Sequence, residues 1–324
     1  MKNPVLYIVV PCFNEEKVLP ETAKRLSAII MSLVSSESIS NKSRILFVDD
    51  GSFDSTWNII LDLNGKSSVF TGIKLAHNSG HQNALWAGMM QARDRCDILI
   101  SMDADLQDDP NALKSFIEEY KKGADIVYGV RSKRRQDTFF KRNAARLYYR
   151  LLHHMGADII ADHADYRLLS RRAIDALSQF SETNLFLRGM IPQLGFKTAK
   201  VYYERSERFA GESKYPLKKQ MALAVEGITS FSIKPIRFVF AAGIICALFG
   251  IIIAIYALIQ KAASSTVKGW TSIIVSMWII GGVVLIGLGI IGEYIGKIYM
   301  EVKRRPRYII DTSLIDDRNG DDDR

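Results

Sequence analysis

The sequence is poor in cysteine, and its start does not read as an export signal. Its 324 residues include three cysteines, Cys12, Cys96 and Cys246, which lie far apart and form no CxxC spacing. A secreted scaffold held together by disulfides is therefore excluded, and cytosolic chemistry is favoured. Residues 1–16 contain a short strand-like run that soon meets Asn-Glu-Glu, without the flanks of a signal peptide. We expect the N-terminus to stay in the cytosol.

Two further features narrow the class of protein. A dinucleotide-binding fold places a glycine-rich turn after its first strand, but residues 11–14 read Pro-Cys-Phe-Asn. This argues against a dinucleotide-dependent oxidoreductase. The formal net charge is +8, and much of the excess lies beside apolar segments near the C-terminus. Anionic lipid is therefore the expected partner of these basic residues, and no nucleic acid is expected.

Charged side chains are absent from two long apolar runs in the last third of the chain. The runs extend over Phe238–Ile259 and Trp270–Gly292, and each exceeds 20 residues. Each is long enough to cross about 30 Å of hydrocarbon as a helix. Ten residues separate them, so the sequence predicts a two-helix transmembrane hairpin with both flanking segments on one side of the bilayer.

Basic residues set the predicted orientation of this hairpin. Lys and Arg are frequent before residue 238 and after residue 296, whereas the short loop carries only Lys261 and Lys268. Because cytoplasmic segments are enriched in Lys and Arg, the large N-terminal region is predicted to lie in the cytosol. Glycines at 281, 282, 287, 289, 292 and 296 would allow close helix packing, within the hairpin or between copies in a homo-oligomer.

Ahead of the membrane segment, apolar runs of strand length alternate with segments of helical period. This alternation predicts an α/β fold with a mostly parallel, doubly wound sheet. The expected strands are Leu6–Val10, Arg44–Val48, Gly72–Ala76, Asp97–Met102 and Asp125–Val130. Such sheets bind their ligands at the carboxyl ends of the strands, so the residues that follow each strand are the candidates for a site.

We expect four parts along the chain. Residues 1–213 form the cytosolic α/β domain, 214–235 an amphipathic juxtamembrane segment, 236–296 the two membrane helices, and 297–324 a basic and then acidic tail. The juxtamembrane segment fits a helix at the membrane interface, and it fits equally well an amphipathic helix packed on the domain. The tail after Arg307 is polar and acidic, and is expected to be disordered.

Acidic residues follow three of the predicted strands, and the clearest case is Asp103-Ala104-Asp105-Leu106-Gln107 after the fourth. Carboxylates that are buried together repel one another, and a hard divalent ion bridging phosphate oxygens would neutralise them. Asp103, Asp105 and Gln107 alternate along an extended turn and so share one face. The same triplet also occurs in helix caps and solvated loops, but its place after a buried strand favours Mg²⁺ or Mn²⁺.

The Asp49-Asp50-Gly51-Ser52 turn after the second strand suits a nucleoside. A carboxylate can accept hydrogen bonds from a uracil imide or a ribose hydroxyl, and Gly51 lets the backbone come close to a ligand. An ordinary strand-to-helix turn explains the same residues, and the two interpretations are compatible. The five histidines, including His77 and His81, show no convincing metal-ligand spacing, and we interpret them as surface or helix-cap residues.

Six motifs follow one another along the chain: PCFNEE, VDDGSFDST, HNSGHQNAL, MDADLQDDP, DYRLLSRRAIDAL and RFAGESKYPLKK. In this order they resemble the family 2 inverting glycosyltransferases of GT-A fold, a Rossmann-like architecture. More narrowly, they resemble the polyprenyl-phosphate glycosyltransferases, the group of dolichyl-phosphate mannose synthase and bacterial undecaprenyl-phosphate glucosyltransferases. The likeness extends from Pro4 to about Arg305 and includes the membrane hairpin of the bacterial branch.

The resemblance implies a set of site residues. The nucleotide-binding residues would be Pro11, Phe13, Asn14, Glu15, Asp50, Asn78 and Asp103. The metal would be held by Asp103, Asp105 and Gln107. The catalytic residues would be Asp103, Asp165 and Arg131, with Asp165 at the position of the family's proposed catalytic acidic residue. The acceptor phosphate would be held by Arg131, Ser132, Arg205, Arg208 and Lys214.

The chemistry of the implied acceptor shapes the expected mechanism. A lipid phosphate monoester has a second pKa of about 6 and is mostly a dianion at neutral pH, so it needs almost no general base. Catalysis would depend on metal stabilisation of the leaving diphosphate and on basic side chains that hold two anions in line. Asp165 would then orient the sugar or a basic partner rather than take a proton.

We therefore expect transfer of a hexose from a UDP-sugar, UDP-glucose first, to undecaprenyl phosphate with inversion. The reaction would occur at the cytosolic face of the bacterial cytoplasmic (inner) membrane, in a multi-pass protein that serves cell-envelope glycan modification. UDP-GlcNAc or another sugar donor is the near alternative. A processive polysaccharide synthase would carry a Gln-x-x-Arg-Trp stretch, and no Arg-Trp pair occurs. A non-catalytic membrane scaffold would have lost part of the metal motif, which is intact.

Overall fold

The computed structural model describes residues 3–131, 163–183, 185–204 and 270–315, together with single positions between 236 and 252. The chain divides into two compact units. The first, which we call the α/β unit, comprises Met1–Leu147, Ile159–Pro216 and Arg305–Arg324. The second comprises Tyr148–Asp158 and Leu217–Arg304.

Within the described part of the α/β unit, eight strands form one sheet in the order β7-β5-β6-β4-β1-β2-β3-β8. The strands are β1 (Leu6–Cys12), β2 (Arg44–Asp49), β3 (Phe70–Leu75), β4 (Ile98–Ser101), β5 (Ile126–Arg131), β6 (His163–Ser170), β7 (Thr198–Tyr203) and β8 (Ile310–Ser313). β1 pairs in parallel with β2 and β4, as do β2 with β3 and β5 with β7. β6 runs antiparallel between β4 and β5. The sheet is thus mostly parallel, as predicted.

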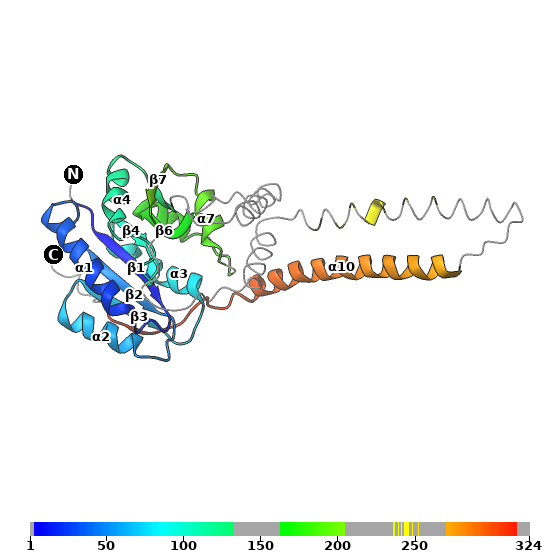
Figure 1. Ribbon diagram of the computed structural model, residues 1–324, viewed down its shortest axis with the longest axis horizontal. Helices are drawn as coiled ribbons and strands as arrows, with labels where there is room; N and C mark the ends of the chain where they lie inside the picture. The colour runs from blue at the N-terminus through cyan, green and yellow to red at the C-terminus, as the bar shows by residue number, and fades with distance from the viewer. Residues whose placement is uncertain are drawn as a thin grey trace, which may run out of the picture. The chain divides into compact units, whose positions relative to one another are not determined.

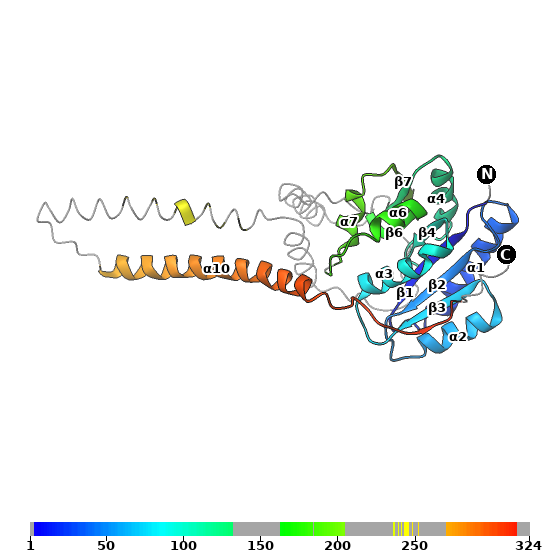
Figure 2. The same ribbon diagram turned by 180° about the vertical axis from the view of Figure 1, so that it is seen from behind.

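Helices cover both faces of this sheet (Figures 1 and 2). They are α1 (Leu19–Ser35), α2 (Thr56–Lys66), α3 (His81–Ala92), α4 (Ala112–Lys121), α6 (Arg171–Leu177) and α7 (Leu187–Gln193). Alternate strand residues such as Leu6, Ile8 and Val10 share one core cluster with the buried residues of α1 and α4. α3 packs on the opposite face, where a Cβ at Gly88 would lie 2.4 Å from Val9 Cγ1. Glycine at this position lets α3 approach the sheet closely.

The five predicted strands are confirmed as β1 to β5, within a few residues of their expected ends. Three strands were not predicted, namely β6, β7 and β8. The apolar stretch of β6 is interrupted by Asp165 and Arg167, so its sequence does not read as a buried strand. β7 alternates regularly between exposed and less exposed residues, but its sequence, Thr-Ala-Lys-Val-Tyr-Tyr, contains one aliphatic residue larger than alanine and does not read as an apolar run.

The prediction of a disordered tail is wrong for the residues that form β8. Ile310–Ser313 pair antiparallel with β3, so the chain returns to the sheet after its last long helix. Polar composition misled the prediction here, because an edge strand joins the sheet through its main chain, and its solvent-facing side chains can be polar. Residues 316–324, which complete the predicted tail, lie outside the described residues.

The second unit contains α10 (Trp270–Lys303), a helix of 34 residues. It includes the predicted second membrane run and continues beyond it to Lys303. Among the described residues, one stretch, Ile280–Lys303, is long and apolar enough to cross a membrane. The first predicted run, at 238–259, is described only at single positions, all of them helical, and the juxtamembrane segment 214–235 lies outside the described residues.

Candidate active site

The site begins where strand β4 ends. Ser101, the last residue of β4, pairs with Arg167 of β6 in an antiparallel register. Two residues further along this register, Asp103 comes beside Asp165. Ser101 Oγ also donates a hydrogen bond to the main-chain carbonyl of Asp165, which fastens the two strands at this point. Two acids that lie 62 positions apart in the sequence are thus brought together by one strand pairing.

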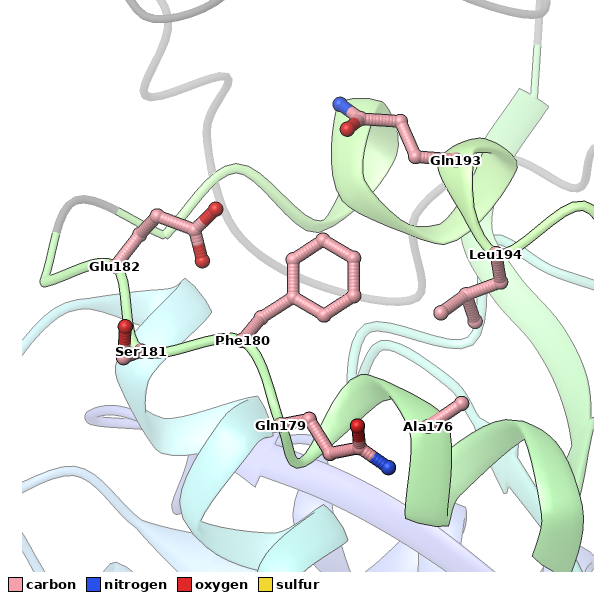
Figure 3. A pocket seen from close by; sticks show the side chains of 7 residues that line it. All are labelled: Ala176, Gln179, Phe180, Ser181, Glu182, Gln193 and Leu194. Atoms are coloured by element: carbon pink, nitrogen blue, oxygen red, sulfur yellow. The ribbon is translucent and has the colours of Figure 1, made fainter.

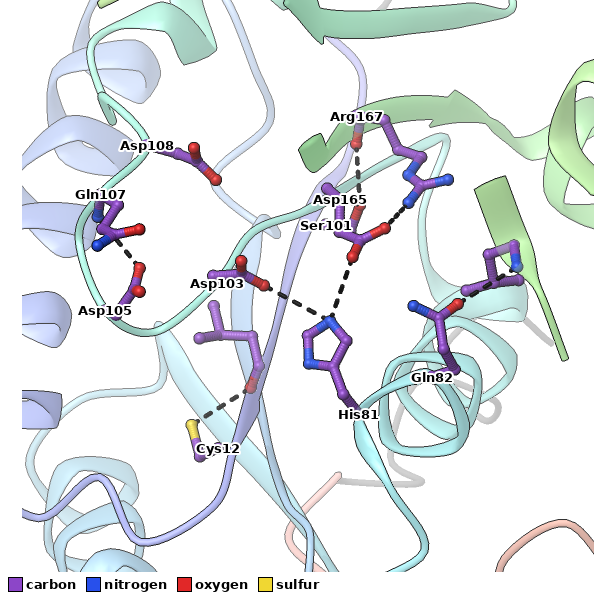
Figure 4. Close-up of polar contacts among 12 residues, drawn as sticks. Cys12, His81, Gln82, Ser101, Asp103, Asp105, Gln107, Asp108, Asp165 and Arg167 are labelled. Atoms are coloured by element: carbon purple, nitrogen blue, oxygen red, sulfur yellow. Dashed lines mark hydrogen bonds and ion pairs between the residues drawn. The ribbon is translucent and has the colours of Figure 1, made fainter. Parts of the chain in front are cut away.

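His81 lies between these two carboxylates. Its Nε2 atom is 3.6 Å from Asp103 Oδ1 and 3.6 Å from Asp165 Oδ2 (Figure 4). Burial alone would lower its pKa, but the close contact with the Asp165 carboxylate and the charge of Asp103 raise the pKa of His81 to about 9. The imidazole is therefore a cation at neutral pH. Its interpretation as a surface or helix-cap residue missed this role, although His81 does open helix α3.

Asp165 is held by two arginines in addition to His81. The fully buried Arg167 donates from Nη2 to Asp165 Oδ1, and Arg188 donates from Nη2 to Oδ2 at 3.1 Å and from Nε to Oδ1 at 3.3 Å. Although burial opposes ionisation, the charge of Arg167, the close contact with His81 and the charge of Arg188 hold the pKa of Asp165 well below its ordinary value. Asp165 is therefore an anion with both carboxylate oxygens engaged by cations.

Asp103 has one carboxylate oxygen, Oδ1, that is buried. Within the described part of the chain, no group donates a hydrogen bond to it. Burial raises the pKa of Asp103 to about 6 against the charge of His81, and the like charges of Asp165, Asp108 and Asp105 add to the rise. A divalent cation would relieve this repulsion, and oxygen donors are the ligands that Mg²⁺ and Mn²⁺ prefer. The residues present therefore fit such an ion.

The other two predicted metal ligands lie further along the same loop. Gln107 N donates to Asp105 Oδ1 at 3.2 Å, across Leu106, whose φ is 56°. Figure 4 shows both residues on the side of the loop away from His81. In the part of the chain that the structure describes, no three His, Cys, Asp or Glu side chains are grouped around one metal position. The structure therefore does not gather Asp103, Asp105 and Gln107 around one point, and their joint role as metal ligands stays a prediction.

The loops after β1 and β2, which carry the predicted nucleotide residues, are joined by hydrogen bonds. Asn14 N donates to Ser52 Oγ at 2.9 Å, and Phe53 N donates to Asn14 Oδ1 at 2.9 Å. The rings of Phe13 and Phe53 meet edge to face with centroids 6.2 Å apart. Glu15 N donates to the hydroxyl of Thr56 at 2.9 Å. Strand adjacency in the sheet thus brings these two motifs together, as predicted.

Asp50 links the second strand end to the loop before α3. Its two carboxylate oxygens accept hydrogen bonds from Ser79 N at 2.7 Å and Gly80 N at 3.0 Å. A Cβ at Gly51, whose φ is +67°, would lie 2.7 Å from Asn78 N. Glycine is required there on both counts. Asp50 and Asn78, predicted separately, are therefore neighbours, and Asp50 positions the start of the helix that presents His81.

Arg131, at the end of β5, is paired with an acid of the metal motif. It donates from Nη2 to Asp108 Oδ1 at 3.0 Å, and Tyr203 Oη donates to the same oxygen at 2.6 Å. Although burial opposes the charge, Asp108 holds the pKa of Arg131 above its ordinary value. Arg131 is therefore cationic and fixed in place beside the loop of Asp103, with about a quarter of its side chain exposed (27%).

The structure describes some of the predicted site residues and not others. Pro11 is buried within β1. Four of the five predicted acceptor-phosphate residues lie outside the described residues, namely Ser132, Arg205, Arg208 and Lys214. Sequence reasoning missed His81, Arg167 and Arg188 as members of the site. His81 and Arg167 do lie within motifs that carry the resemblance, HNSGHQNAL and DYRLLSRRAIDAL, and that signal could have found them.

A separate pocket lies on the α/β unit between α6 and α7. Its volume is about 540 Å³, and Figure 3 shows the side chains that line it. These are Ala176, Gln179, Phe180, Ser181, Glu182, Gln193 and Leu194. The lining includes none of the carboxylates or cations around Asp103, so this pocket is distinct from the candidate active site.

Comparison with known proteins agrees with this architecture. Residues 7–177 match the family model "Glycosyl transferase family 2", and residues 234–298 match the model "GtrB C-terminal hairpin". The chain belongs to glycosyl transferase family 2, and it is a glycosyltransferase.

Relatives share nearly the whole length of the chain. The "Uncharacterized glycosyltransferase YkoT" of Bacillus subtilis (strain 168) is 50% identical over 98% of this chain and 94% of its own. The "Bactoprenol glucosyl transferase" of Shigella phage SfII is 37% identical over 94% of this chain and 97% of its own. Among solved structures, glucosyl-3-phosphoglycerate synthase from Mycobacterium tuberculosis is similar at 16% identity with a TM-score of 0.48. That likeness covers 70% of this chain and 79% of the other.

Two substitutions in one loop separate the metal site from general effects of charge. Asp103→Asn should lower turnover by at least about 100-fold, because it weakens the binding of a divalent ion that stabilises the leaving group. Asp109→Asn makes the same charge change six positions later, where Asp109 Oδ1 accepts from Asn111 N at 3.0 Å, a bond that an amide oxygen preserves. The turnover of Asp109→Asn should stay within about twofold of the wild-type turnover.

The measurement is the initial rate of sugar transfer by the detergent-solubilised full chain, with thermal unfolding as the check on folding. Wild-type turnover in Asp103→Asn, or equal losses in the two variants, would remove the metal site from this account.

Proposed function

We propose that this glycosyltransferase transfers a hexose, with glucose as first choice, from a UDP-sugar to undecaprenyl phosphate with inversion. The reaction takes place at the cytosolic face of the bacterial cytoplasmic membrane and supplies a lipid-phosphate-linked sugar for cell-envelope glycan modification. The relatives named bactoprenol glucosyl transferases support a lipid carrier as acceptor and glucose as the sugar. The match of residues 234–298 to the hairpin model supports a membrane location.

The observation that carries the proposal is that both carboxylate oxygens of Asp165 are already engaged by cationic side chains. In an inverting transfer to an alcohol, an acid at this position would take a proton from the acceptor. Asp165 is a poor base, because Arg167, Arg188 and His81 hold its pKa well below the ordinary value. An acceptor that is already an anion needs no such base. The geometry therefore favours a phosphate acceptor over a hydroxyl acceptor.

The chemical step follows from this choice. A phosphate oxygen of the acceptor attacks the anomeric carbon of the sugar, and the bond from that carbon to the nucleotide diphosphate breaks, with its electron pair leaving on the diphosphate. When bound, a divalent ion held by Asp103, Asp105 and Gln107 supplies positive charge to the departing diphosphate. Asp165 holds Arg167, Arg188 and His81 in place. Arg131, fixed by Asp108, adds a positive charge for the acceptor phosphate.

The loops after β1 and β2 are proposed to hold the nucleotide. Phe13 and Phe53 present aromatic rings from neighbouring loops, and Asp50 and Asn78 lie together at the next strand end. These groups suit a nucleobase and a ribose, because rings stack on bases and carboxylates accept from ribose hydroxyls. UDP-GlcNAc is the alternative donor, because these groups would contact the nucleotide and would not distinguish one sugar from another.

We also propose the two-helix transmembrane hairpin, and the strand order of the sheet supports it. Strands before the membrane segment and β8 after it belong to one sheet. A chain that leaves a domain for the membrane and returns to the same domain crosses the bilayer an even number of times. Since α10 supplies one crossing, another is expected between residues 205 and 269, where the run Phe238–Ile259 lies. A Cβ at Gly287 of α10 would lie 3.0 Å from Val239 Cγ1, which supports close packing of this run on α10.

Single cysteines test the hairpin in a chain whose three native cysteines are replaced by alanine. A cysteine at position 264, in the predicted outer loop, should react with a membrane-impermeant maleimide added to intact cells. A cysteine at position 32, exposed on α1 of the cytosolic domain, should react only after the membrane is permeabilised. Labelling of position 264 only after permeabilisation would contradict the two-span hairpin.

A panel of sugar donors tests the reaction itself. Purified full-length protein is supplied with Mg²⁺ or Mn²⁺, undecaprenyl phosphate and radiolabelled UDP-glucose, UDP-GlcNAc, UDP-galactose or GDP-mannose. Label from UDP-glucose should appear in the lipid fraction and should require the phosphate on the lipid, with undecaprenol as the matched control. Transfer to undecaprenol at a similar rate would overturn the argument from Asp165, and transfer from no donor would overturn the proposal.

A further inference from the structure

The chain re-enters the α/β unit after α10 through residues 307–314, which we call the return segment. Its strand β8 pairs with β3, and the pairing is extended at both ends by main-chain hydrogen bonds. Ala76 N donates to Ile309 O at 2.9 Å, and Leu314 N donates to Gly72 O at 2.8 Å. Ala76 directly precedes the loop of residues 77–80 that leads into α3. The return segment therefore lies against the strand that feeds the candidate nucleotide loop.

Arg307, at the start of the return segment, contacts two further elements. Its guanidinium carbon lies 4.5 Å from the ring centroid of Trp86, a buried residue of α3. Its Nη2 atom donates to the main-chain oxygen of Phe180 at 2.9 Å. Phe180 belongs to the connection between α6 and α7. A single arginine thus ties α3 to the segment that precedes α7.

Helix α3 and helix α7, which follows this connection, carry two of the three cations that hold Asp165. His81 is the first residue of α3, and Arg188 is in the first turn of α7. The start of α7 has one further tie to α3, because Leu187 N donates to Gln82 Oε1 at 3.3 Å. The two helix starts are therefore joined directly at Gln82 and indirectly through Arg307. Both ties lie within the α/β unit.

We propose that Arg307 is a positioning residue of the active site, which sets the spacing of His81 and Arg188 around Asp165 by clamping Trp86 to Phe180. The return segment would then have two roles. It pairs with the edge strand β3, and it holds together α3 and α7, which carry His81 and Arg188. Removing the guanidinium loses a cation–π contact and a charge-assisted hydrogen bond together. The helix starts should then separate more often, while the sheet stays paired.

Hydrogen exchange of the full chain in detergent tests the clamp without any substrate. In Arg307→Gln, amides in the first turns of α3 and α7 should exchange about tenfold faster than in the wild type. Amides of α1 and α4, on the opposite face of the sheet, should be unchanged. The matched control is Arg305→Gln, an equal charge change at an exposed position two residues away, which should leave all four helices at the wild-type rate.

Two results would overturn the proposal. Exchange in α3 and α7 that equals that of Arg305→Gln would show that Arg307 does not hold these helices. Faster exchange throughout the sheet and all helices would show that Arg307 contributes to global stability alone. If Arg307→Gln does not accumulate as folded protein, Arg307→Lys decides by the same comparison, because lysine keeps the charge but lacks the planar donor group.

A kinetic readout links the clamp to catalysis, and this readout alone rests on the proposed function. In Arg307→Gln, kcat for sugar transfer should fall about tenfold while the KM for the nucleotide sugar changes less than about twofold. The reason is that the clamp acts on Asp165 and leaves the loops after β1 and β2 intact. A changed KM with an unchanged kcat would overturn it. Absence of transfer by the wild type would refute the proposed function and leave the exchange result to decide the clamp.

Discussion

The ion pair between Asp165 and the fully buried Arg167 is the interaction around which the site is arranged. Both residues lie on β6, the antiparallel strand inserted between β4 and β5. Breaking a buried pair by removing one partner typically costs about 3–5 kcal/mol, since the other charge is left without compensation. The register of β6 on β4 then places Asp103 beside this pair, and α3 and α7 contribute His81 and Arg188. One strand insertion therefore accounts for most of the site's geometry.

The distribution of charge gives the two central acids different roles. Asp165 is surrounded by cations that belong to the protein, so it remains an anion and accepts no further proton at neutral pH. Asp103 has one such neighbour, His81, and faces the like charges of Asp165, Asp108 and Asp105. The charge of Asp165 is thus neutralised by side chains of the protein, whereas the charge of Asp103 would be neutralised fully only by a bound cation. This division suits a transferase whose acceptor arrives already ionised and whose leaving group needs charge stabilisation.

Much of this could be predicted from the sequence, and the remainder has identifiable reasons. The parallel core was predictable because β1 to β5 are regular apolar runs and their polar ends must meet at one edge. The meeting of Asp103 and Asp165 was not, because β6 carries a buried arginine and aspartate and does not read as a strand. His81 gave no signal by spacing, since its partners come from the loop after β4 and from β6. β8 was missed because composition suggested disorder, while pairing with β3 depends on the main chain.

We propose above all that Asp103, whose negative charge is only partly neutralised by His81, binds a divalent cation. The effect of metal on thermal stability tests this most directly. Thermal unfolding of the full chain would be followed with Mn²⁺ or with chelator, at pH 5 and pH 7.5. We predict that Mn²⁺ at about 100 times its Kd raises the unfolding temperature at pH 7.5 by about 5 °C. The rise should be smaller at pH 5, because Asp103, with a pKa of about 6, is then protonated and must lose its proton to bind the ion. Asp103→Asn should abolish the rise. An equal rise at both pH values, or in the variant, would contradict the claim.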